Sequence, residues 1–599
     1  MHPIKRIYKL MTRKTKLAFL VVLIIAILES SSTIASPKIV EILIDRVFVG
    51  TEYNLLLPLI AIAVAIVVAK AIFLFLQGYL NEYIAQNIVF IIRHKLYSKI
   101  QRQSIDFFDR IESGQLISRG TTDIDAIKRL MSLGFRSILR SIILYIGIFI
   151  MIGISDPYSL IIVGVIAPIL FIIMFSFTSR RRYLFKNIQN KFGDLNSVLK
   201  ENVRGARVVR AFATEEFEIT KFEKENEAYM NMNIHMAKLK SLMNVLFPFV
   251  LGLGSVAIWF FGGRQVINGV LALGALVAFI SYIQLLQTST RFMISGIIYY
   301  QEGVAGMNRI YEIIDMENKV TNRPGAIDLP KIEGNIFFEK VTFAYRDGER
   351  PVLKKITLDI LAGETVAFLG TTGSGKSTIV SLVPRFYDPQ EGAVYIDNID
   401  IRDIKIDSLR SKIALVQQEA FLFARTIKEN IAFGKPDATL DEIIQVAKIA
   451  QAHDFIMETP NGYDTVVGER GVTLSGGQKQ RLTIARALLL DYPILIMDDS
   501  SSALDFETEN QFQKAVNALV KNRTTLIVTQ RLSTIKFATK IVVMNNGEIE
   551  EIGTHEELIM KKGLYKYLYE TQLLSQQDSF DTIEIESKEK QIETDIIEE

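Results

Sequence analysis

The sequence predicts a protein of two unlike parts: an all-α membrane domain of six spanning helices, then a cytosolic α/β domain that carries a phosphate-binding loop. Three observations support this prediction. Hydrophobic residues make up 49% of the 599-residue chain, and the mean hydropathy is +0.24, which is high for a soluble protein. The long apolar stretches all lie before about residue 320. Beyond that point, short β-rich runs alternate with helical runs.

Six apolar stretches are the candidate spans, most of them long enough for the ~20 residues that cross a bilayer. They are residues 17–40, 55–80, 138–154, 160–177, 245–267 and 273–300. The first also resembles a secretory signal peptide, because basic residues precede it and "ESSSTIAS" follows it. We favour a spanning helix, because apolar character resumes in "KIVEILIDRVFV" and no A-x-A cleavage pattern is evident.

Basic residues predict the topology of these spans. They gather before the first span, after the second and after the fourth: Lys5, Arg6, Lys9, Arg13, Lys14, Lys16, Arg93, Lys95, Arg180, Arg181 and Arg182. The segments that contain them are therefore expected to be cytoplasmic. Residues 86–135 and 180–241 are long and charged, whereas the outer loops "GTEYN" and "SDPYS" are short. We therefore expect the helices to continue past the inner face of the membrane as stalks.

Charge and cysteine content exclude several classes of function. The chain has 68 Lys+Arg against 66 Asp+Glu, so its overall charge offers no argument for a nucleic-acid partner. It has no cysteine, which excludes disulfides, thiolate metal sites and cysteine nucleophiles. Redox chemistry is not expected.

Composition also predicts the domain boundaries. We assign residues 1–320 to the membrane domain with its long cytoplasmic extensions, and residues 321–332 to a linker that contains "TNRPGAIDLP". Residues 333–575 form the α/β domain. Residues 576–599 form an acidic tail, interpreted as a solvated tail or a frayed helix with no assigned function.

A phosphate-binding loop opens the chemistry of the α/β domain. The apolar run "ETVAFLG" reads as a buried strand that enters "GTTGSGKST", a full match to G-x-x-x-x-G-K-[ST], and the helical run "TIVSLV" begins at its last residue. Its glycines let successive N–H groups point at phosphate oxygens, and the helix N-terminus adds partial positive charge. The predicted nucleotide-binding residues are Gly370, Thr371, Thr372, Gly373, Ser374, Gly375, Lys376, Ser377 and Thr378.

Three of the side chains have particular expected roles. Lys376 would reach the β- and γ-phosphates, and Ser377 would offer its hydroxyl to Mg²⁺. Asp498 ends the apolar run "ILIM" and is expected to complete the site from a parallel neighbouring strand, where it would hold Mg²⁺ directly or through water. ATP and Mg²⁺ are therefore the expected cofactors.

A second anion-binding surface follows in "LSGGQKQRLTIARAL". Its first five residues, Leu474, Ser475, Gly476, Gly477 and Gln478, stand just ahead of a predicted helix. Because the first phosphate cradle is already complete, a second one makes sense as a cap on nucleotide held by another domain. "GTTGSGKST", "LSGGQ" and "DDSSSALD", in this order and behind six apolar stretches, resemble the ATP-binding cassette of half-size ABC exporters.

The resemblance implies a dimer in which two cassettes enclose two ATP molecules, each between one chain's phosphate loop and the other chain's "LSGGQ". Tyr345 in "VTFAY" is similar to the aromatic residue that stacks on adenine, and Gln418 in "ALVQQ" to the catalytic glutamine that senses Mg²⁺. Asp505 is similar to an aspartate at the dimer interface. Residues 107–125 and 201–216 resemble the cytoplasmic loops that carry coupling helices.

Two positions depart from the family pattern. Asp499 stands where the family has the glutamate that orients the attacking water. Its side chain is one methylene shorter, so its carboxylate falls short by roughly 1.5 Å. Because misplacement near 1 Å costs about 10²-fold in rate, hydrolysis should be slow. Gln530 in "LIVTQRLST" stands where a histidine is expected, and it cannot carry the imidazole's charge. The resemblance then implies a degenerate catalytic site in one subunit of a heterodimeric, bacterial multidrug-type exporter. Hydrolysis would occur mainly where this chain's "LSGGQ" meets a partner's phosphate loop.

The cargo is less defined by the sequence. Aromatic residues in spans four to six suit an amphipathic or hydrophobic small molecule or a lipid, although ordinary lipid-facing packing explains them equally well. Glu29 and Lys70 lie within predicted spans, where ionisable groups are costly; their depths differ by about 10 Å, so a direct pair is not secured. Either could serve the cargo or face a water-filled cavity.

The alternatives to a heterodimeric exporter are a homodimeric exporter with slow turnover, and a nucleotide-gated channel or regulatory subunit. The expected location is a bacterial plasma membrane, with the α/β domain in the cytoplasm.

Overall fold

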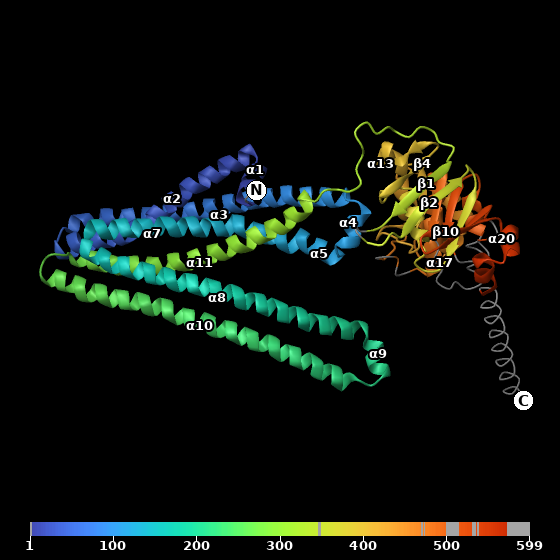
Figure 1. Cartoon of the computed structure of the whole chain (residues 1–599). Coiled ribbons are helices and arrows are strands. Elements are labelled where there is room, and N and C mark those ends of the chain that lie inside the picture. Colours follow the sequence, from blue (N-terminus) through green and yellow to red (C-terminus); the bar gives the residue numbers. More distant parts are fainter. Residues whose placement is uncertain are drawn as a thin grey trace, which may run out of the picture. The chain divides into compact units, whose positions relative to one another are not determined.

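The structure, a computed structural model, describes residues 3–345, 349–468, 471, 474–498, 514–529, 535 and 538–571. The chain divides into two compact units. Unit 1 comprises Met1–Arg102 and Glu112–Met316, and unit 2 comprises Gln103–Ile111 and Glu317–Glu599. Unit 1 is all helical and unit 2 contains two β-sheets flanked by helices. This arrangement, drawn in Figure 1, confirms the predicted fold class.

Six helical segments of unit 1 are long and apolar enough to cross a membrane, among the described residues: Arg13–Val49, Tyr53–Gln101, Ser113–Ser155, Pro157–Arg204, Glu215–Ile267 and Leu273–Asp315. The predicted number of spans is thereby confirmed. The α-helices of the unit are α1 Pro3–Leu10, α2 Arg13–Ile42, α3 Leu56–Gln101, α5 Ser113–Ser118, α6 Ile124–Arg129, α7 Phe135–Ser155, α8 Pro157–Arg204, α9 Ala206–Ala211, α10 Glu215–Ile267 and α11 Leu273–Asp315. Short π- and 3₁₀-helical turns join several of them.

Helices α8 and α10 extend far beyond their apolar stretches, as the stalk prediction requires. The start of α8 is explained by its cap: the Asp156 carboxylate accepts hydrogen bonds from the N–H groups of Tyr158 and Ser159, and Pro157 occupies the first turn. The helix then runs for 48 residues. Figure 1 shows α8 and α10 lying side by side, with the short helix α9 joining their far ends.

Helix α11 forms much of the interior of unit 1, where it packs against α2, α7 and α10. Glycines permit the close approach. A Cβ atom at Gly303 would come within 2.5 Å of the Leu130 side chain, and one at Gly306 within 2.9 Å of the Asp123 carbonyl oxygen. Further along α11, Arg309 pairs with the buried carboxylate of Asp123.

The buried acid in span one has a partner that the sequence analysis missed. Glu29 is fully buried, and its carboxylate lies 3.0 Å from the guanidinium of Arg140 on α7. Arg140 also stacks over the Phe292 ring, 4.8 Å from its centroid. Lys70 lies half-buried on α3, and among the described residues it forms no ion pair. Arg140 falls inside the predicted third apolar stretch, where its own charge was a signal for such a pair.

Unit 2 holds two sheets. The smaller one is antiparallel, with strand order β2-β1-β4-β5, and the larger has the order β10-β9-β3-β8-β7-β6. The strands are β1 Ile336–Phe343, β2 Leu353–Ile360, β3 Thr365–Gly370, β4 Glu391–Ile396, β5 Ile399–Asp400, β6 Ile413–Val416, β7 Ile494–Asp498, β8 Thr524–Val528, β9 Lys540–Asn545 and β10 Glu548–Gly553. The described helices are α4 Ile105–Arg110, α12 Lys376–Leu382, α13 Ile406–Arg410, α14 Ile427–Ile431, α15 Leu440–Ile449, α16 His453–Met457, α17 Gly476–Leu490 and α20 His555–Lys561.

The larger sheet positions the chemistry because its central strands are parallel. Strand β3 pairs with β8 and β9, and β7 pairs with β6 and β8, all in parallel. All six residues of β3 are buried, as expected for a strand covered on both faces. The carboxyl ends of β3 and β7 therefore face the same edge of the sheet, where ligands bind in such folds.

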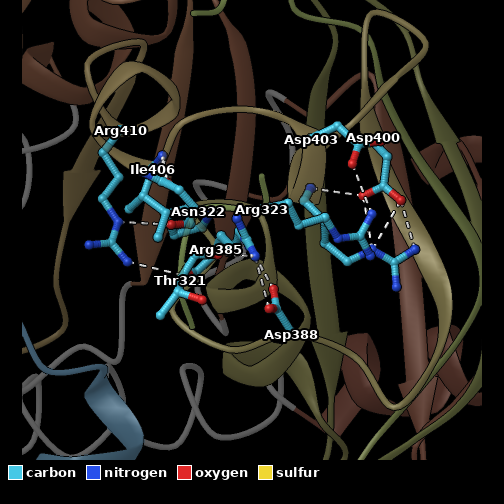
Figure 2. A network of polar contacts seen from close by, with 11 residues as sticks. Thr321, Asn322, Arg323, Arg385, Asp388, Asp400, Asp403, Ile406 and Arg410 are labelled. Carbon is cyan, nitrogen blue, oxygen red and sulfur yellow. Dashed lines mark hydrogen bonds and ion pairs between the residues drawn. The ribbon is translucent and has the colours of Figure 1, made fainter. Parts of the chain in front are cut away.

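A polar network attaches residues 321–323 to the α/β fold, as Figure 2 shows. The buried guanidinium of Arg385 pairs with Asp388 and donates to the Thr321 carbonyl oxygen at 3.0 Å. The Asn322 side chain accepts from the N–H of Ile406 at 2.8 Å, and Arg323 pairs with Asp403 at 2.9 Å. This segment therefore has fixed partners within unit 2.

Candidate functional site

The loop between β3 and α12 has the backbone of a phosphate cradle. Gly370, Gly373 and Gly375 have φ values of +144°, +84° and +101°, in the region that L-residues avoid. A Cβ atom at Gly370 would lie 2.1 Å from the carbonyl oxygen of Met544 on β9. Glycine is thus required there by contact as well as by conformation.

Lys376 begins α12 and turns back over this loop. Its ammonium donates to the carbonyl oxygens of Gly370 at 2.9 Å and Thr371 at 2.8 Å, and the residue is 9% exposed. Burial lowers the pKa of Lys376, an effect that the negative charge of Asp498 opposes. The loop therefore holds a poorly solvated cation at the place where phosphate oxygens are expected.

Three predicted side chains line one cavity of about 330 Å³: Ser377, Gln418 and Asp498. Burial raises the pKa of the Asp498 carboxyl, while a hydrogen bond with Ser377 and the charge of Lys376 oppose the rise. Hydroxyl, amide and carboxylate oxygens are the ligand types that Mg²⁺ takes in proteins. Among the described residues no cluster of three His, Asp or Glu side chains could hold a metal, so water or ligand oxygens would have to complete the coordination.

The sequence led us to expect Asp498 on a strand that neighbours β3, but its strand, β7, is not the immediate neighbour of β3. Strand β8 lies between β3 and β7. The expectation failed because β8 is contributed by residues after Asp498 and enters the sheet at its centre, an order that local sequence pattern does not encode. Asp498 still reaches the cavity, because β7 runs parallel to β3 and ends at the same edge.

Tyr345 follows β1 and is 38% exposed. Its phenol is within hydrogen-bonding distance of the Thr378 hydroxyl, at 2.9 Å, so the predicted adenine-stacking residue is attached to the end of the phosphate loop. Burial raises the pKa of Tyr345, which keeps the phenol neutral at physiological pH. Asp499, Gln530 and Asp505 lie outside the described residues.

The predicted second anion-binding surface begins helix α17. Ser475 caps this helix: its hydroxyl accepts from the N–H of Gln478 at 3.3 Å, and the Gln478 side chain accepts from the Ser475 N–H at 2.9 Å. Among the described residues, a Cβ atom at Gly476 would meet no neighbour within 4 Å. Within the described part of the chain, Ser475 and Gly476 are exposed at the donor-rich start of α17, a surface that another molecule can approach.

A contact within unit 2 escaped the sequence analysis. The hydroxyl of Tyr387 donates to the Asp109 carboxylate on α4 at 2.5 Å, and the Tyr387 ring meets that of Tyr345 edge to face at 5.3 Å. Burial raises the pKa of Tyr387, so the phenol remains a donor. The short helix α4, from one of the predicted coupling loops, is thus linked to the aromatic residue at the phosphate loop. No local motif marks either partner.

We expect Tyr387→Phe to loosen α4 while leaving the sheets intact. The change removes one hydrogen bond to a charged group, which contributes about 1.5–3 kcal/mol, but it keeps the aromatic packing. Amide hydrogen exchange in Ile105–Arg110 should accelerate at least about tenfold. Tyr395→Phe is the matched control, because the Tyr395 hydroxyl donates to Glu339 at 2.9 Å on the exposed face of the smaller sheet. Equal exchange of α4 in both variants would contradict the inferred link.

Each of the two units matches a known protein family. Residues 19–290 match the family model described as ABC transporter transmembrane region, and residues 353–502 match the model described as ABC transporter. A lipid A-core flippase of Syntrophus aciditrophicus, described as ATP-dependent, is 38% identical over 91% of this chain and 90% of its own length. YgaD of Bacillus subtilis, provisionally named a multidrug export ATP-binding/permease protein, is 37% identical over 95% of this chain and 99% of its own.

The solved structure of a bacterial Atm1-family ABC exporter with ATP bound is also similar, with a TM-score of 0.79 and 26% identity over 93% of this chain and 98% of that one. The six candidate spans make the chain an integral membrane protein. The identity and coverage of these relatives, together with matches in both units, place the chain in the ABC transporter family, as an exporter with a transmembrane domain and an ATP-binding domain.

Proposed function

We propose that this chain is one half of a heterodimeric exporter in a bacterial plasma membrane, and that its own phosphate loop forms an ATP site of slow turnover. One observation carries the proposal. Asp499 and Gln530 replace the two groups that assist hydrolysis, while Lys376, Ser377 and Asp498, which serve binding, are present. Two matched losses in one function are unexpected in a site selected for turnover.

In this proposal the nucleotide lies along the loop between β3 and α12. Tyr345 stacks on adenine, residues 370–378 hold the phosphates, and Lys376 contacts the β- and γ-phosphates. Ser377, Asp498 and Gln418 provide oxygen ligands for Mg²⁺, supported by the cavity that all three line. When bound, Mg²⁺ neutralises charge on the phosphate oxygens.

The first turn of α17 acts on the partner's nucleotide. Leu474 and residues 475–478 would cap the γ-phosphate held by the partner's loop, and Asp505 would lie at the interface between the cassettes. The open space at Gly476 supports this role. Most hydrolysis would therefore take place at the composite site built from this chain's "LSGGQ" and the partner's phosphate loop.

The proposed cargo is an amphipathic or hydrophobic small molecule, or a lipid, moved out of the cytoplasm or the inner leaflet. The names of the relatives support both classes, since one is provisionally named for multidrug export and another is named a lipid A-core flippase. A homodimeric exporter with two slow sites, and an ATP-gated channel or regulatory subunit, are the alternatives that experiment has to separate.

The decisive experiment is native mass spectrometry of the tagged chain purified from its own cells in mild detergent. We expect a one-to-one complex with a second half-size chain. A complex of two identical chains would overturn the heterodimer. ATP-dependent uptake of a lipophilic dye into inside-out vesicles then separates pump from channel, because only a pump accumulates the dye against its gradient.

A further inference from the structure

A cavity of about 720 Å³ in unit 1 lies among α8, α10 and α11. Its position follows from the topology. The cavity contacts Phe177 at the end of span four and Met243 just before span five, both at cytoplasmic ends by the positive-inside rule. On α11, Arg291 follows Leu273 by 18 residues, which is about 27 Å along a helix in a core about 30 Å thick. The cavity therefore lies at the depth of the inner leaflet and its headgroups.

One side of the cavity is apolar and well packed. Phe247, Met243 and Ile188 line it and are each less than 10% exposed, and Phe177 adds an aromatic ring. Buried apolar side chains in a wall of this kind offer a surface to an alkyl chain or ring, which gains by leaving water.

The charged side chains that line the cavity are all basic among the described residues. Arg181, Lys240 and Arg291 line the cavity from three different helices. Among the described side chains of the lining, none is acidic, and no ion pair within the described residues neutralises these three cations. Arg181 also lines an adjoining smaller cavity together with one acid, Glu302, and this acid pairs with Arg129 at 3.6 Å. Lys240 and Arg291 are exposed and Arg181 is half-buried, so all three cations are accessible to an anion that enters the cavity beside the apolar wall.

We infer that this cavity binds an amphiphile whose polar end is an anionic phosphate or carboxylate group, with Arg181, Lys240 and Arg291 around the anion and the apolar tail against Phe177 and Phe247. The inference rests on the proposed exporter function and narrows its cargo class. A cationic amphiphile would meet three like charges and, among the described side chains of the lining, no counter-charge. The shared chemistry admits two sources, a lipid of the inner leaflet or a soluble amphiphile from the cytoplasm.

Isothermal titration calorimetry on the complete complex in phosphatidylcholine nanodiscs tests the inference, with empty nanodiscs as the blank. Dodecyl phosphate should bind at least about tenfold more tightly than dodecyltrimethylammonium or inorganic phosphate. Lys240→Gln should weaken dodecyl phosphate about tenfold. Lys238→Gln is the matched control, because Lys238 is exposed on the same helix two residues away and does not line the cavity; it should leave the affinity unchanged.

Several outcomes would overturn the inference. One is an equal loss of affinity in the Lys240→Gln and Lys238→Gln variants at equal thermal stability, which would mean that the cations only anchor the helices at the membrane surface. Another is binding of dodecyltrimethylammonium as tight as that of dodecyl phosphate. Tight binding of inorganic phosphate alone would show that the apolar wall contributes nothing.

Competition by phosphatidic acid in the nanodisc supports a lipid source, and binding of dodecyl phosphate without such competition supports a soluble one.

Vesicle uptake separates failure of this inference from failure of the exporter proposal. ATP-dependent uptake of dodecyltrimethylammonium without uptake of dodecyl phosphate would preserve the exporter and reject the anionic cargo. Charge-selective binding that depends on Lys240, without uptake of either probe, would preserve the site and reject the pump.

Discussion

Restoring the two missing hydrolytic groups, with Asp499→Glu and Gln530→His together, should raise ATP turnover at this chain's own site by roughly 10²-fold. Glutamate extends the carboxylate by one methylene towards the attacking water, and histidine returns a ring that can carry charge. The binding residues stay as they are, so the gain should appear in kcat with little change in KM.

The measurement requires a background in which the other composite site is silent. Ser475→Arg provides it, because Ser475 caps the helix proposed to complete the partner's site. Phosphate release is then compared with and without the double change. Asp437→Glu, at an exposed turn residue, controls for the added methylene. If turnover in the restored protein stays at the level of the Ser475→Arg background, side-chain reach is not the cause of slow hydrolysis.

Removing the phosphate-loop cation, with Lys376→Ala, should weaken ATP binding at this site by about 10²-fold or more. Each hydrogen bond from a charged donor to a phosphate oxygen contributes about 1.5–3 kcal/mol, and 1.4 kcal/mol corresponds to tenfold in affinity. Lys376 is nearly buried, so its charge acts in a medium of low polarity. The two ATP molecules expected per dimer should fall to one, at a nucleotide concentration that saturates only the intact sites.

Native mass spectrometry counts the bound nucleotides directly. Lys448→Ala is the control, since Lys448 is an exposed lysine of α15. Lys376 also donates to the Gly370 and Thr371 carbonyl oxygens, so thermal unfolding must show that the loop change has not unfolded the domain. A folded Lys376→Ala dimer that retains two ATP molecules would remove Lys376 from the proposed phosphate contacts.

Features with a local cause could be predicted from the sequence. The six spans follow from the length of apolar stretches, and the strand–loop–helix at "GTTGSGKST" follows from three glycines whose φ values are positive in the structure. The long α8 and its start at Asp156 and Pro157 likewise depend on neighbouring residues. In each case the free energy that forms the element comes from groups close together in the chain.

Features with a distant cause could not be predicted. From the sequence, Asp498 was expected on a parallel strand neighbouring β3, whereas β8 separates the two strands, because strand order depends on which edges remain unpaired as the sheet forms. A pair between Glu29 and Lys70 was not secured from the sequence, and the Glu29 carboxylate pairs with Arg140 on another helix.

By itself, then, the sequence determined the class of each half, the phosphate loop and the residues on which slow hydrolysis is proposed to depend. The tertiary structure alone decided which of these residues share a cavity, that Tyr387 connects α4 to Tyr345, and that Arg181, Lys240 and Arg291 line one cavity that has an apolar wall. The physical reason is that periodicity and turn chemistry act over a few residues, whereas packing brings together side chains more than a hundred positions apart.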